Sequence, residues 1–229
     1  MNLFAILSLG FILGTRHATD PDHVVAVTTI VSGHRNVRGA ALVGAAWGLG
    51  HTLTILLVGS GIILFKWVIP PRLGLAMEMA VAVMLIVLGL ANLTGTMRWI
   101  RRRRRKETLA QVHSHAHSRG DYGRPLVVGI VHGLAGSAAI ALLVLATIQT
   151  PLWSVAYLLI FGIGTIAGMM LITAAISVPF VLGGGQFARL QRNLRVASGL
   201  ISLGFGLVVA YQIGRIDGLF RAELHWTPK

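Results

Sequence analysis

The chain has 229 residues, of which 55% are apolar and 12% charged, and its mean hydropathy is +0.75; a soluble domain carries about 25% charged residues, so this composition indicates a polytopic membrane protein. The absence of cysteine excludes disulfides, thiolate metal ligands and dithiol redox chemistry. Basic residues outnumber acidic ones by 20 to 7, but most of this excess lies in residues 98–124, between two apolar stretches, which favours a topology signal over a nucleic-acid surface.

Six apolar stretches are long enough to cross a membrane, since a spanning helix needs roughly 20 mainly apolar residues. In chain order they are 2–32, 39–65, 73–97, 125–149, 152–182 and 196–214. We therefore predict an all-α polytopic membrane protein with six transmembrane helices. The first is interrupted between Thr15 and His23, and the fifth ends or kinks around Pro179. No ATP-binding G-x-x-x-x-G-K-[ST] motif occurs, so the chain has no ATPase motif of its own.

The interruption of the first span gathers polar residues at 17–23, which read His-Ala-Thr-Asp-Pro-Asp-His. In a continuous helix Asp22 and His23 would point about 140° and 240° away from His17, so the three could not bind one ion. Pro21 cannot donate a hydrogen bond to the carbonyl of His17, and it forces Asp20 out of helical geometry. A helix break is therefore expected where it would bring these side chains together.

A second half-helix would start directly after the break. Asp20 suits the N-cap position, Pro21 the first helical position, and Asp22 the positive end of the helix dipole. For Asp20 we favour this capping role over metal ligation.

The second span carries a histidine at matching depth. His17 is the midpoint of 2–32 and His51 is one residue from the midpoint of 39–65, so both are expected near the bilayer centre. An aspartate at that depth costs roughly 2.5–3.5 kcal/mol, and intramembrane ionisable residues are functional by default. Gly48 and Gly50, next to His51, favour close helix packing. A functional site is thus preferred over a structural polar patch.

Histidines with one carboxylate favour a borderline divalent ion. Mg²⁺ and Ca²⁺ prefer oxygen ligands, whereas imidazole suits Ni²⁺, Co²⁺ or Zn²⁺, and the ligand types alone do not choose among these three. The ion is expected as a transported substrate, with no prosthetic group. Arg16 is expected to pair with Asp20 or Asp22 and keep them ionised.

A faint internal repeat relates the two halves of the chain. Gly14-x-x-His17 in the first span matches Gly129-x-x-His132 in the fourth, so His132 is expected either to support the site or the ion pathway or to be a polar packing residue. Three spans per half require inverted topology, a common transporter plan. The expected parts are residues 1–97 as the first three-helix half, 98–124 as a loop, 125–215 as the second half, and 216–229 as a tail.

The distribution of basic residues predicts the orientation. The loop 98–124 and the connections after spans one and five hold most of them, which places these segments in the cytoplasm and both termini outside. We expect a multi-pass protein of the cell inner (plasma) membrane. The loop also contains a short tract suited to sampling metal in the cytoplasm, formed by His113, His115 and His117.

Two motifs carry a family resemblance. His17-x4-Asp22-His23 resembles the H-x4-D-H signature of the nickel/cobalt transporter (NiCoT) family, and Leu49-Gly50-His51-Thr52 is similar to its Leu-Gly-His-Ser/Thr motif. The six-span length, the residues His-Ala-Thr-Asp-Pro-Asp-His at 17–23 and the segment His132-Gly-Leu-Ala-Gly-Ser resemble the UreH-like branch of this family. The resemblance covers all six spans and implies transition-metal transport, with the residues His17, Asp22, His23 and His51 as metal ligands.

Together these features predict a nickel/cobalt permease that takes up a divalent cation through a midplane site. Three alternatives stay open: metal efflux, a membrane metalloenzyme for which Asp20 is the spare carboxylate, and an anion exporter with Arg16 as substrate ligand.

Overall fold

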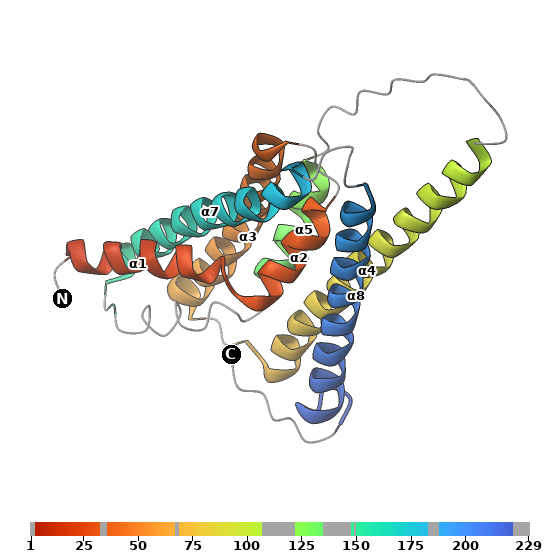
Figure 1. Cartoon of the computed structure of the whole chain (residues 1–229). Helices are drawn as coiled ribbons and strands as arrows, with labels where there is room; N and C mark the ends of the chain where they lie inside the picture. The colour runs from red at the N-terminus through yellow and green to blue at the C-terminus, as the bar shows by residue number, and fades with distance from the viewer. Residues whose placement is uncertain are drawn as a thin grey trace.

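The computed structural model describes residues 3–32, 36–66, 69–106, 122–134, 148, 150–182 and 188–221. The described residues form helices and no strands (Figure 1). In chain order these helices are α1 (Leu3–His17), α2 (Pro21–Val31), α3 (Val37–Phe65), α4 (Pro71–Lys106), α5 (Gly123–Gly133), α7 (Pro151–Leu182), α8 (Ala188–Tyr211) and the π-helical turn η3 (Gln212–Ile216).

Among the described residues, four segments are long and apolar enough to span a membrane: Val37–Phe65, Pro71–Gly95, Pro151–Pro179 and Arg192–Ile216. They agree with the second, third, fifth and sixth predicted spans. The first predicted span is divided into the two shorter helices α1 and α2. The fourth, 125–149, is described only at 125–134 and 148, so most of it lies outside the described residues. The described part of the chain is therefore all-helical, with four clear spanning segments.

Helix α4 continues past the predicted start of the basic loop at residue 98. It ends at Lys106 and includes the run Arg101–Arg105. Arginine and lysine are good helix formers, and helix formation is cooperative, so an established helix extends readily into such a run. The tract at residues 113–117 lies outside the described residues.

The predicted break in the first span lies between His17 and Pro21. Pro21 is the first residue of α2, and Asp20 precedes it with extended backbone torsions of φ −58° and ψ 143°. The Asp20 carbonyl accepts a hydrogen bond from the Val24 amide at 3.0 Å, which starts the new helix. The Asp20 carboxylate, however, caps no backbone amide of α2. Its side chain is used elsewhere.

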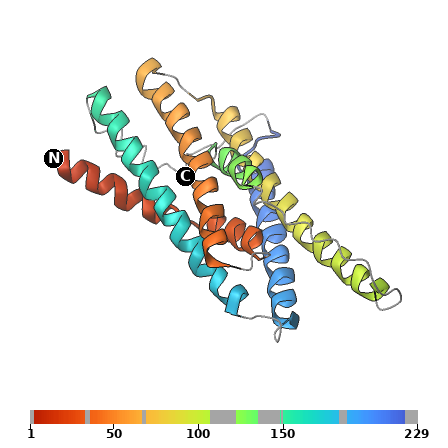
Figure 2. The same cartoon turned by 90° about the horizontal axis from the view of Figure 1, so that it is seen from above.

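The helices pack in pairs, with α1 against α7, α5 against α3, α3 against α7, and α4 against α8 (Figures 1 and 2). Two glycines set how closely the backbones approach. A Cβ at Gly14 would overlap the backbone carbonyl of Phe161 on α7, and a Cβ at Gly129 would overlap that of Trp47 on α3. In lipid the hydrophobic effect does not drive helices together, so their association depends on close van der Waals packing. Small residues at these crossings allow the backbones to come that close.

Helix α2 lies between two groups of helices, one formed by α1, α3, α5 and α7 and the other by α4 and α8 (Figure 1). It contacts α4, α7 and α8. Its C-terminal end is tied to α4 and α8 by a polar cluster. The Asn92 amide donates hydrogen bonds to the Ser32 hydroxyl at 3.3 Å, the Ser198 hydroxyl at 3.0 Å and the Arg195 carbonyl at 3.1 Å. The Arg195 guanidinium donates to the Ser32 carbonyl at 3.1 Å. These hydrogen bonds pair polar groups that would be costly to leave unpaired inside a membrane.

Large apolar side chains cover the outside of the long helices, as expected for surfaces that face lipid. Examples on α3, α4, α7 and α8 are Leu57, Val87, Leu171 and Val208, each more than half exposed. The interior combines large apolar side chains, such as those of Trp47 and Phe161, with small residues and with buried histidine, serine and threonine side chains. Apolar side chains on the outer faces as well as in the core agree with a multi-pass membrane protein.

Candidate metal centre

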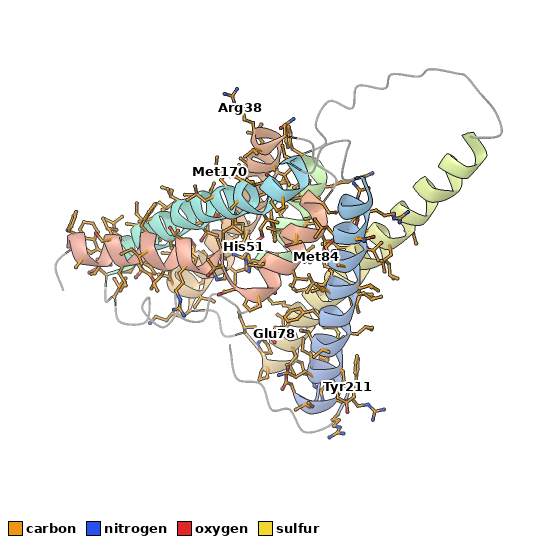
Figure 3. All side chains as sticks on the ribbon, viewed as in Figure 1. Arg38, His51, Glu78, Met84, Met170 and Tyr211 are labelled. Atoms are coloured by element: carbon orange, nitrogen blue, oxygen red, sulfur yellow. The ribbon has the colours of Figure 1, made fainter. Side chains whose placement is uncertain are left out.

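Five side chains from four helices converge at the break between α1 and α2. His17 ends α1, Asp22 and His23 begin α2, His51 is the central residue of α3, and His132 lies in the last turn of α5. The side chains of His23, His51 and His132 are fully buried and that of His17 nearly so. Figure 3 shows His51 in the middle of the molecule, beside the end of α1.

The first group of donors consists of His17, His23 and His51. The Nε2 atoms of His17 and His51 are 2.9 Å apart. The His23 ring lies 4.6 Å from the His17 ring and 5.1 Å from the His51 ring, centroid to centroid. One nitrogen from each residue can be chosen so that all three lie within 4.8 Å of one another. Three imidazole nitrogens at this separation can reach a single transition-metal ion.

Two carboxylates fix the orientation of two of these rings. Asp20 Oδ2 lies 2.8 Å from His17 Nδ1, and Asp22 Oδ1 lies 3.2 Å from His23 Nδ1. A neutral imidazole that donates its Nδ1–H to a carboxylate keeps the Nε2 lone pair for a metal. The Nε2 of His23 is buried and has no hydrogen-bond partner. Asp20, expected as a helix cap, therefore acts on His17 instead.

A second group of donors consists of Asp22, His23 and His132, and it also fits within 4.8 Å. Asp22 Oδ2 lies 2.9 Å from His132 Nε2, and the rings of His23 and His132 are 4.1 Å apart. Asp22 thus contacts His132 and His23, and it is not grouped with His17 and His51. His132, expected to support the site or the pathway or to be a polar packing residue, is part of the cluster.

Two aromatic residues that the sequence reasoning did not single out form walls of the cluster. Trp47 stacks on His23 with 5.8 Å between centroids and 13° between planes, and Phe161 lies 5.6 Å from His17. Trp47 is one helical turn before His51 and hence on the same face of α3, which is the signal that could have identified it. Both side chains exclude water from the imidazoles.

The other predicted residues take less central positions. Pro21 is exposed at the start of α2. The Thr52 hydroxyl is buried and donates a hydrogen bond to the Gly162 carbonyl at 3.2 Å, joining α3 to α7. Arg16 is exposed, and within the described part of the chain no ion pair joins it to Asp20 or Asp22. The expected pairing of Arg16 with these carboxylates is thus absent, because the carboxylates face histidines.

The fold and this cluster define a helical membrane protein with a buried, nitrogen-rich donor set suited to divalent transition metals. Comparison with known proteins names the family. The chain belongs to the NicO family, described as high-affinity nickel-transport protein, whose model matches residues 3–219. This match confirms the resemblance inferred from the two motifs. A transport family also makes the chain a transporter and not an enzyme.

Two relatives extend the comparison. Over 231 aligned residues the chain is 36% identical to the urease accessory protein UreH of Bacillus sp. (strain TB-90), which covers 96% of this chain and 97% of the relative. It is 26% identical over 207 residues to the chloroplast protein FOR GROWTH AND FERTILITY 2 of Arabidopsis thaliana, covering 87% of this chain and 54% of that protein. No solved structure matches the chain.

Proposed function

We propose that the chain is a nickel permease, with cobalt as a second substrate, that binds the cation inside the membrane and imports it. The imidazoles of His17, His23 and His51 would supply nitrogen ligands, and the Asp22 carboxylate beside His23 would supply negative charge. The observation that carries this proposal is the convergence of the His17 and His51 Nε2 atoms to 2.9 Å in a buried cluster. Family membership supports nickel as the substrate.

The donor chemistry supports the same class of ion. Three imidazoles suit Ni²⁺, Co²⁺ and Zn²⁺, whereas Mg²⁺ dehydrates reluctantly and prefers oxygen. Burying an ionisable cluster inside a membrane is costly unless it performs a function. Because His51 is the central residue of the spanning helix α3, the cation would be held near the middle of the bilayer.

An inverted repeat of three plus three spans is part of this proposal, and reciprocal contacts support it. A Cβ at Gly164 would overlap the backbone carbonyl of Phe11, and a Cβ at Gly50 would overlap that of Leu126. Phe11 and Leu126 are 115 residues apart, and Gly50 and Gly164 are 114 apart. In each half, the glycine of one helix therefore packs against the corresponding residue of the other half. Such symmetry is the basis of alternating access in many transporters.

The proposed orientation places residues 98–124 in the cytoplasm and both termini outside, in the plasma membrane. Asn92 contacts Arg195, so the basic C-terminal end of α4 and the basic N-terminal end of α8 lie at one end of the molecule. Figure 3 shows Arg38 and Tyr211 near opposite ends. Basic residues at one end are what the positive-inside rule requires.

Accumulation of radioactive nickel in cells expressing the protein tests both function and direction. Import predicts that wild-type protein raises cell nickel and that His51→Ala removes most of this increase. Leu57→Ala, an exposed position on the same helix, is the matched control and should behave as wild type. A fall in cell nickel on expression of wild-type protein would instead establish efflux, and no change in either direction would refute transport of nickel.

A further inference from the structure

The two groups of donors in the metal centre share one residue, His23. Its ring lies next to all three other histidine rings, at 4.6 Å from His17, 5.1 Å from His51 and 4.1 Å from His132. His17 pairs with His51 through their Nε2 atoms, and His132 pairs with Asp22. His23 is thus the central residue of the cluster, with one pair of donors on each side.

We propose that the cation occupies two overlapping positions in turn. His17, His23 and His51 form position one, and Asp22, His23 and His132 form position two. This inference rests on the proposed function, because it describes how a transported ion would move through the same cluster. Its new content is a second metal position in which His132, from the second half of the chain, is a ligand.

The two nitrogens of the His23 ring have different surroundings. Nδ1 lies 3.2 Å from Asp22 Oδ1, on the side of position two, and Nε2 is buried without a partner. A neutral imidazole has only one nitrogen with a free lone pair, because the other carries the proton. His23 can therefore serve one position at a time. The cluster should bind a single ion, which changes partners by moving past the His23 ring.

The two positions also differ in charge. Position one has three neutral imidazoles, and position two replaces one imidazole nitrogen with the carboxylate of Asp22. The Nδ1 atom of His132 is buried and has no hydrogen-bond partner, which leaves Nε2, the atom next to Asp22, as the nitrogen that the geometry places at the site. An ion in position one has no carboxylate among its direct ligands, and it would gain one in position two. This difference gives the movement a preferred direction within the cluster.

Co²⁺ titration of the purified full chain in lipid nanodiscs tests the proposal, because visible absorption of Co²⁺ reports the number and type of its ligands. His51→Ala removes a ligand from position one only, His132→Ala from position two only, and His23→Ala from both. We expect one Co²⁺ per chain in the wild type and in the first two variants, with a different spectrum in each. His23→Ala should weaken binding by roughly tenfold or more, because loss of a ligand should cost at least as much as loss of a residue that supports one.

Flux into proteoliposomes gives a second readout. His132→Ala should still bind Co²⁺ at position one, within a few-fold of wild-type affinity, while its flux falls by roughly tenfold or more because the ion cannot pass on. His132→Asn keeps a polar group in place and should give the same separation of binding from flux. It serves as the test if the alanine variant fails to fold, as judged by its elution from a sizing column.

Two results would overturn the proposal. Unchanged flux and spectrum in His132→Ala and His132→Asn would exclude His132 as a ligand. Equal loss of binding in His51→Ala and His132→Ala would indicate one five-residue site instead of two positions. Wild-type protein that binds neither Co²⁺ nor Ni²⁺ would refute the proposed function itself, a result that is distinct from both.

Discussion

The Nε2 atoms of His17 and His51 lie 2.9 Å apart although 34 residues separate them in the chain. The contact depends on the packing of two helices, because His17 is the last residue of α1 and His51 lies at the centre of α3. Close contact between two imidazole nitrogens requires one of them to carry a proton and the other a lone pair. A bound dication would replace that hydrogen bond with two metal–nitrogen bonds.

Asp20 should control metal affinity without being a ligand, because its carboxylate holds the Nδ1 side of the His17 ring. We expect Asp20→Asn to weaken Ni²⁺ binding by roughly 10–100-fold, the usual effect of removing a carboxylate behind a metal-bound histidine. Isothermal calorimetry on the purified protein measures this change. Asp217→Asn, beyond η3 and outside the cluster, is the control. Equal affinities for wild type and Asp20→Asn would show that the contact with His17 is incidental.

Pro21 should matter for the site through the backbone. Pro21→Ala removes the clash that stops α1 from continuing, so we expect weaker Ni²⁺ binding with the protein still folded. Pro179→Ala is the matched control, since Pro179 lies inside α7, which continues past it to Leu182. Calorimetry with a thermal unfolding curve separates the two effects. Wild-type affinity in Pro21→Ala would mean that side-chain contacts alone maintain the break.

The glycine contacts predict a stability pattern. Gly14→Ala and Gly129→Ala would each place a Cβ against a backbone carbonyl of the neighbouring helix, and overpacking of this kind costs roughly 1–3 kcal/mol. A Cβ at Gly204 meets nothing within 4 Å, so Gly204→Ala should be neutral or slightly stabilising. Thermal unfolding in detergent measures all three variants. Similar losses at Gly14 and Gly129 would support the inverted repeat, and a loss at only one of them would count against it.

Selectivity should follow the nitrogen donors. We expect Co²⁺ and Zn²⁺ to compete with Ni²⁺ for binding, and about a hundredfold excess of Mg²⁺ to have no effect, because Mg²⁺ requires oxygen ligands. Displacement of radioactive nickel from the purified protein measures the competition. Displacement by Mg²⁺ would indicate that carboxylates and water, and not the imidazoles, hold the ion.

The sequence predicts the break and its histidines well but not the contacts across the two halves. Pro21 acts on its own neighbours, so its effect on the helix could be worked out locally. The same holds for the equal depth of His17 and His51, which follows from span midpoints. The contact of Asp22 with His132 joins residues 110 positions apart, and it depends on how α5 packs on α3. Asp20 illustrates the limit: the sequence correctly places it at the start of α2, but its side chain contacts His17 instead of capping the helix.

Helix α2 has a mechanical consequence for the cluster. It is 11 residues long, hence about 16 Å from end to end, and it carries Asp22 and His23 at its first turn. Its other end, at Ser32, is hydrogen-bonded to Asn92 and Arg195. A short helix moves as a rigid body, so a displacement of the Ser32 end also displaces the end that carries Asp22 and His23. A tilt of α4 and α8 would therefore move the imidazole of His23 together with α2, and under the proposed function such a tilt would change the set of donors around the ion.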